Sequence, residues 1–141
     1  MVFNLLHLMY HQFTIHFDVY PFNNIEKIKP KIRTIKSLAC GILMLFPLIA
    51  LRTKNFLLIE ISAVILFLIL VKEIIDWWIP YLFGASKEWK NHYLKIFAET
   101  TIMLSAIRDN PIPNLEHCIL HTLTLLSFLF IIVYYLIIYM P

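Results

Sequence analysis

The sequence predicts an all-α integral membrane protein with three transmembrane helices, or four if the N-terminal segment also crosses, and a cytoplasmic interfacial amphipathic helix. Hydrophobic residues make up 60% of the 141 residues, compared with roughly 45–50% in soluble proteins. Long apolar segments recur, and the charged residues gather between them. A soluble domain of this length has too little interior for so much apolar surface, so a lipid-facing exterior is expected.

Residues 1–24 form an amphipathic N-terminal segment, separate from a membrane bundle in residues 25–141. Polar side chains at spacings of three and four predict one polar helix face: Asn4, His7, His11, Thr14 and Asp18. Alternation over residues 13–19 also fits a strand. We favour a helix to about residue 18 because an unpaired strand edge is costly near lipid. This helix either lies in the interface or forms an extra span.

The first predicted span covers residues 30–51. Pro30 suits the first turn of a helix, and Pro47 is expected to kink it. The fully apolar part, residues 38–51, is short for roughly 30 Å of hydrocarbon, so long basic side chains must reach the surface. A collar of basic residues precedes and enters this helix, and we expect it to face lipid: Lys27, Lys29, Lys31, Arg33 and Lys36.

The second predicted span covers residues 56–78 and pairs with the first as an antiparallel hairpin. Pro80 and Gly84 are expected to end this helix. Aromatic side chains typical of the headgroup zone occur at its end and shortly beyond: Trp77, Trp78, Tyr81 and Trp89.

An interfacial amphipathic helix is predicted over residues 86–107, with Ser86 as its cap. The prolines of residues 108–114 predict an extended loop. Asn114 can cap a last span, residues 115–140, which is the longest apolar segment.

The basic residues are distributed asymmetrically about these spans. Ten lie on the side of the collar and of the loop 79–114, and only Arg52 and Lys54 lie on the other. The positive-inside rule places the basic side in the cytoplasm and the C-terminus outside. The expected partners are anionic lipid headgroups, and a second copy of the chain or another membrane protein. Nucleic-acid binding is not expected, since lipid is the nearer anionic partner.

Histidines and carboxylates gather towards the cytoplasmic side, as a candidate metal-binding or polar cluster: His7, His11, Glu73, Asp76, His92, Glu116, His117 and His121. Imidazoles four residues apart on a helix can share a divalent metal ion. The HxxxH spacing resembles membrane di-iron hydroxylases and desaturases, although their denser histidine pairs are missing. The alternative, which we favour, is that His117, His121, Thr124 and Ser127 form a polar stripe at a helix contact.

Glu60 is predicted to lie one helical turn inside the outer end of the second span. An ionisable residue at that depth is a functional candidate. A structural role is favoured, in which Glu60 reaches the outer interface and pairs with Arg52 or Lys54.

The sequence points to no catalytic residue. The segments 77–86 and 109–114, followed by His117 and His121, resemble small bacterial membrane proteins, and this resemblance implies no activity. We expect an accessory, immunity-type or regulatory protein that acts through helix contacts. A metal-dependent membrane enzyme or metal-binding protein, and a small oligomeric transporter, are the alternatives.

Overall fold

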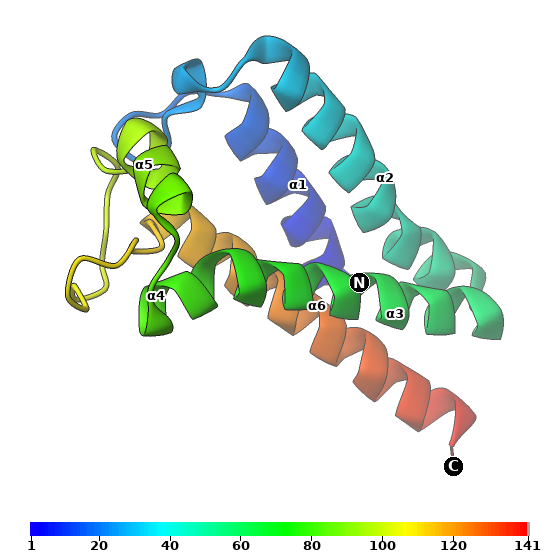
Figure 1. The fold of residues 1–141 in the computed structure, drawn as a ribbon. Helices are drawn as coiled ribbons and strands as arrows, with labels where there is room; N and C mark the ends of the chain where they lie inside the picture. The colour runs from blue at the N-terminus through cyan, green and yellow to red at the C-terminus, as the bar shows by residue number, and fades with distance from the viewer. Residues whose placement is uncertain (141) are drawn as a thin grey trace.

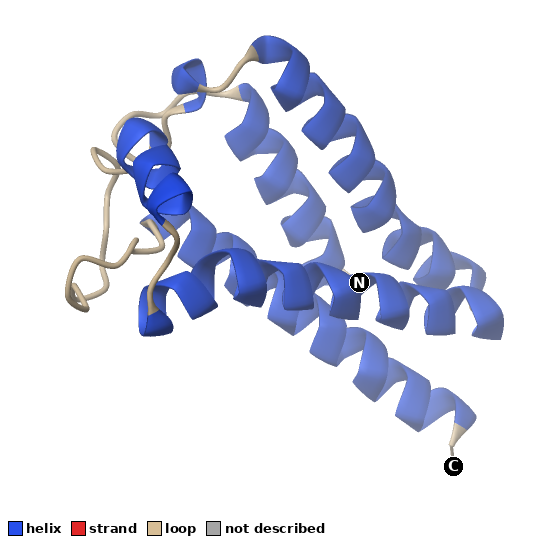
Figure 2. Ribbon diagram, in the orientation of Figure 1, coloured by secondary structure: helices blue, strands red, loops and turns tan. Residues whose placement is uncertain are grey.

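A computed structural model describes residues 1–140, and these are almost entirely helical (Figure 1). The elements in chain order are α1 (Val2–His16), η1 (Ile25–Lys27), α2 (Pro30–Thr53), α3 (Phe56–Glu73), η2 (Ile74–Trp78), α4 (Ile79–Phe83), α5 (Lys87–Ile96) and α6 (Leu115–Tyr139). Figure 2 shows helices and loops without a strand in this part of the chain; only an isolated bridge joins Ile102 to Asn114. The all-α prediction is confirmed.

Four long helices form the body of the protein. Helix α1 packs against α2 and α6, and α3 packs against the same two helices. Helix α1 runs antiparallel to α6, because Phe3 meets Phe130 and His7 meets Thr124. Helix α3 does the same, because Phe56 meets Tyr135 and Phe67 meets Phe128. Helices α4 and α5 and their loops gather at one end, opposite the C-terminus (Figure 1).

Helices α2 and α6 are long and apolar enough to cross a membrane. They have 24 and 25 residues, or about 36 Å and 37 Å at 1.5 Å per residue. The predictions for these two segments are therefore confirmed at the level of helix length and composition. Helix α3 has 18 residues, of which three are charged: Glu60, Lys72 and Glu73.

Part of the helical interior is polar, and many large apolar side chains point outward. On α1, the predicted polar face is buried at Asn4, His7, His11 and Thr14. Large apolar side chains are exposed along all four helices, for example Met9, Ile42, Leu68 and Ile137. A water-soluble helical bundle has the opposite arrangement.

Helices α1 and α2 approach closely at Gly41. A Cβ atom there would lie 2.7 Å from Gln12 Nε2, which is too close for a real contact. The Gln12 amide in turn donates to the Ser37 carbonyl at 3.1 Å and accepts from the Ser37 hydroxyl at 2.7 Å. This pairing holds the end of α1 beside the start of α2.

The helical path that begins with α3 is longer than the sequence predicted. It continues through one π-helical turn, η2, and through α4 to Phe83, and Gly84 ends it with φ 104°. Pro80 lacks the N–H that would bond to the Asp76 carbonyl one turn earlier. The Trp89 indole N–H donates to that carbonyl at 3.0 Å, so the helix passes through Pro80.

The helix predicted over residues 86–107 is α5, and it ends at Ile96. Ser86 and Asn114 cap α5 and α6 as predicted. Beyond α5, the backbone bonds to distant segments: Thr101 N–H donates to the Pro21 carbonyl at 2.7 Å, and Leu115 N–H to the Thr101 carbonyl at 2.8 Å. These long-range bonds replace the continuing helix.

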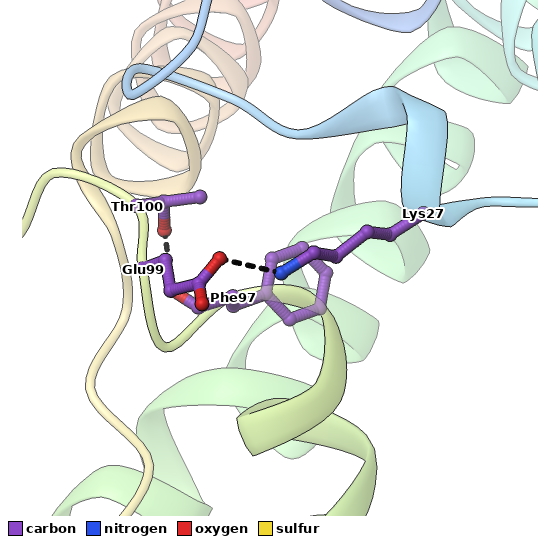
Figure 3. Close-up of polar contacts among 4 residues, drawn as sticks. All are labelled: Lys27, Phe97, Glu99 and Thr100. Atoms are coloured by element: carbon purple, nitrogen blue, oxygen red, sulfur yellow. Dashed lines mark hydrogen bonds and ion pairs between the residues drawn. The ribbon is translucent and has the colours of Figure 1, made fainter.

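An ion pair also ties this loop to η1. Lys27 Nζ lies 2.7 Å from Glu99 Oε2, and the Thr100 hydroxyl donates to the Phe97 carbonyl next to it (Figure 3). One member of the predicted basic collar is therefore engaged within the protein.

Candidate functional site: a cavity between the helices

A cavity of about 450 Å³ lies at the end of the bundle near η2 and the start of α6. Six of the eight residues of the predicted cluster line it: His11, Glu73, Asp76, Glu116, His117 and His121. The residues come from α1, α3, η2 and α6, and α2 closes the remaining side. The structure thus brings together groups that are far apart in the sequence.

Thr124 joins the other deep member of the cluster, His7, to this cavity. Thr124 Oγ1 lies 2.7 Å from Glu73 Oε1 and 3.0 Å from His7 Nε2. A hydroxyl has one proton to donate, and the carboxylate is the stronger acceptor. His7 Nε2 therefore donates to Thr124, and Thr124 donates to Glu73, in a chain that spans three helices.

His121 is oriented by an indole from the π-helical turn. Trp78 Nε1–H donates to His121 Nδ1 at 3.1 Å. In the neutral imidazole, Nδ1 is then the unprotonated nitrogen and Nε2 carries the proton. His121 accordingly offers a hydrogen-bond donor, and no lone pair, from Nε2.

His117 has the opposite tautomer. Its Nδ1 donates to Asn114 Oδ1 at 2.5 Å, since the Asn114 amide nitrogen is itself used as a donor to Thr100. The His117 ring packs against Trp77 in a tilted arrangement, with ring centroids 3.9 Å apart. His117 Nε2 is left as an acceptor.

The eighth residue of the cluster, His92, lies apart from the rest. It lines a second cavity of about 370 Å³, together with Trp77, Trp89 and Phe97. Lys36, Asp76 and His117 line both cavities.

The four aromatic anchors predicted for the headgroup zone make specific contacts within the protein. Trp77 and Tyr81 are buried. The Tyr81 hydroxyl donates to the Ser105 carbonyl, while Trp78 and Trp89 bond to His121 and to the Asp76 carbonyl as described.

Two residues assigned to the lipid-facing collar contribute to the cavity, a role that the sequence did not suggest. Arg33 and Lys36 line it, and neither forms an ion pair within residues 1–140. Lys72 also lines it but is paired with Asp76. Lys36 and Cys40 share one face of α2 and both line the cavity, but this face is identified only by the other helices that pack around it.

Three polar groups in the interior have no hydrogen-bond partner within the described residues. They are Glu73 Oε2, the side-chain amide of Asn4 and the hydroxyl of Ser127. The antiparallel register sets Asn4 near the level of Ser127, one turn beyond the pairing of His7 with Thr124. Unsatisfied buried groups are rare and often mark a binding function.

The opposite half of the bundle is apolar and closed. Ala50, Ile59, Leu66 and Ile131 are completely buried there. None of these four side chains lines the cavity.

Glu60 differs from the sequence prediction. Its carboxylate accepts a hydrogen bond from the Tyr135 hydroxyl at 3.2 Å, and no ion pair with Arg52 or Lys54 occurs within residues 1–140. The reason is that α6 packs against this face of α3, and Tyr135 lies level with Glu60.

Across residues 1–140, no three His, Cys, Asp or Glu side chains are grouped so as to hold a metal ion. Comparisons with protein-family models, with curated proteins and with solved structures find no match for this chain. The function must therefore be argued from the cavity and its surroundings.

Proposed function

We propose that this chain is a multi-pass membrane protein that binds a small polar or ionic ligand in the cavity. In this proposal α2, α3 and α6 cross the bilayer. The observation that carries it is the inverted distribution of side chains, with polar groups gathered around a cavity and apolar groups outside. Ionisable groups at membrane depth are costly and usually serve a function.

Helix α1 is proposed to be inserted beside the three spans. Its 15 residues measure about 22 Å, less than the roughly 30 Å of hydrocarbon. It packs lengthwise on α2 and α6 and covers their polar part, and its outward face is apolar. This placement supports insertion over a position flat on the surface.

The cavity end is proposed to face the cytoplasm, because it carries ten of the twelve basic residues. A membrane-impermeant maleimide tests this orientation in intact cells. We expect a cysteine at Lys54 to react and a cysteine at Lys87 to react only after lysis, with both variants in a Cys40→Ala/Cys118→Ala background. The reverse pattern would contradict the orientation.

Ligand binding, rather than conduction, is supported by the closed apolar half. The buried Ile59, Leu66 and Ile131 lie outside the cavity lining, which includes Arg33, Lys36 and Lys72. A volume of about 450 Å³ lies within the range of roughly 300–1,000 Å³ typical of small-molecule sites.

Cys40 offers a direct test, because it lines the cavity and Cys118 does not. In a Cys118→Ala protein in detergent, a small thiosulfonate should modify Cys40, and a solute that occupies the cavity should slow the reaction. The matched Cys40→Ala protein reports on Cys118, whose rate should stay constant. If no solute from a broad panel of ions, amines, phosphates and zwitterions protects Cys40, the proposal is wrong.

A role for metal is the second candidate, and one observation favours it. Asn114 fixes the His117 tautomer so that Nε2 has a free lone pair, as in many histidine ligands. The test is the metal content of the purified protein and of His117→Ala/His121→Ala. Absence of stoichiometric metal, with unchanged stability in the double variant, would remove this candidate.

A further inference from the structure

We infer that the ligand is a small zwitterion, whose ammonium group binds at Glu73 and whose anionic group binds at Arg33 and Lys36. This inference rests on the proposed function and names the chemistry of the ligand. It follows from the two unlike ends of one cavity.

The deep end presents a carboxylate oxygen that has no partner. Glu73 is one of the residues that line the cavity, and its Oε2 is shielded from solvent and receives no hydrogen bond from residues 1–140. Thr124 cannot supply one, because its only proton is directed to Oε1. A buried carboxylate oxygen requires a donor, and a cationic donor gives the strongest hydrogen bond.

The chain from His7 through Thr124 keeps this arrangement fixed. His7 Nε2 donates to Thr124, so the hydroxyl proton remains on the side of Glu73. Oε1 therefore has a partner in Thr124, whose hydroxyl also lies 3.1 Å from the Leu120 carbonyl, and Oε2 has none. His11 and His121 face the same cavity, and Asp76 is already paired with Lys72.

Two basic side chains that form no ion pair within residues 1–140 also line the cavity, together with the Glu116 carboxylate. Arg33 and Lys36 lie within the first two turns of α2, and both line the cavity. Two other lysines of this region do form ion pairs, Lys27 with Glu99 and Lys72 with Asp76. A phosphate or carboxylate is the natural partner of an arginine and a lysine that line the same cavity.

The two ends together exclude simpler ligands. A plain cation would satisfy Glu73 but would face Arg33 and Lys36, and a plain anion would leave the Glu73 oxygen unsatisfied. Trp77 and Phe97 also line the cavity, and aromatic faces attract ammonium groups. Phosphoethanolamine has the required chemistry, either as a free solute or as the headgroup of a lipid.

The first experiment measures binding in detergent by protection of Cys40 and by the rise in Tm. The probes are O-phosphoethanolamine, ethanolamine and inorganic phosphate. We expect O-phosphoethanolamine to bind at least about tenfold more tightly than either fragment, since each fragment loses one charged contact. Equal binding of a single fragment would overturn the zwitterion.

Variants test which residues bind the ammonium group and the anionic group of the ligand. Glu73→Gln and Lys36→Gln should each weaken O-phosphoethanolamine binding by about tenfold or more. The matched controls Glu60→Gln and Lys54→Gln lie at the other end of the bundle and should bind as wild type does. Lys36 is exposed, so its variant remains informative if Glu73→Gln fails to fold. Wild-type affinity in either cavity variant that folds contradicts the assignment.

Measurements in nanodiscs distinguish a lipid headgroup from a free solute as the source of the ligand. If the headgroup of a lipid is bound, phosphatidylethanolamine should raise Tm and protect Cys40 relative to phosphatidylglycerol, and Glu73→Gln should remove the difference. If the ligand is a soluble zwitterion, O-phosphoethanolamine alone should give these effects. If neither form protects Cys40 but another solute does, the zwitterion fails while ligand binding in the cavity stands. If no solute protects Cys40, both the zwitterion and ligand binding in the cavity are wrong.

Discussion

The two halves of the bundle interior are built from the same helices and differ in the side chains that pack at their centre. Near the hairpin turn, α3 and α6 meet through Ile59, Leu66 and Ile131, all fully buried. Near the basic end, the same helices meet through Glu73 and Thr124, with His7 from α1. The apolar half can hold the helices together by packing alone, so the unsatisfied polar groups at the other end indicate a requirement beyond stability.

The largest stability effect is expected in the apolar half. Ile131→Ala would leave a cavity among completely buried side chains and should lower the free energy of unfolding by about 2–4 kcal/mol. The matched variant Ile137→Ala, on the same helix but 70% exposed, should cost much less. Reversible unfolding in mixed detergent micelles measures both. Equal losses would show that the two positions are packed alike and would contradict the closed apolar half.

A smaller effect is expected in the polar half. Thr124→Val keeps the shape of the side chain but removes the hydroxyl between His7 and Glu73. Leaving two buried polar groups unsatisfied should cost about 1–3 kcal/mol. Thr122→Val is the control, because Thr122 is exposed and bonds only to the Cys118 carbonyl of its own helix. If Thr124→Val were as stable as the control, the three-helix chain would not contribute to the fold.

The start of α6 connects the polar half to the loops. Asn114 is fully buried, accepts from His117 N–H at 3.1 Å and donates to the Thr100 hydroxyl at 3.0 Å. Asn114→Ala should lose about 1–2 kcal/mol, as for other helix caps. Asn114→Asp keeps the capping oxygen and should recover part of this loss. Unfolding in detergent gives both values, and no recovery in Asn114→Asp would indicate that the Thr100 contact dominates.

Local patterns predicted much of the fold, and the site only in part. Helical spacing identified the buried face of α1, and the capping roles of Ser86 and Asn114 follow from their own side chains. The polar cluster was recognised because its residue types are unusual in apolar segments.

Partners from distant segments decided the remaining features. The early end of α5 depends on bonds from Thr101 and Leu115, and the helical path through Pro80 depends on the Trp89 indole. The pairing of Glu60 with Tyr135 joins residues 75 positions apart. Local periodicity contains no information about such contacts, and for the same reason it could not show that Arg33 and Lys36 line the cavity.

The smallest effect is expected at the surface, where Lys27 binds Glu99 outside both halves. The hydrogen bond from Lys27, and then its charge, lower the pKa of the Glu99 carboxyl below its ordinary value of 4.5. A lowered pKa in the folded protein means that this contact stabilises the fold above about pH 4.5, and that the contribution disappears as the pH falls through the lowered pKa. Because the pair is exposed, the effect should be small and should weaken further in salt. Comparing Tm for wild type and Glu99→Gln at pH 6 and pH 3.5 measures it, with a slight advantage of wild type expected only at the higher pH. The same advantage at both pH values would mean that charge on Glu99 does not matter, and that the loop is held to η1 and α6 mainly by its backbone bonds to Pro21 and Leu115.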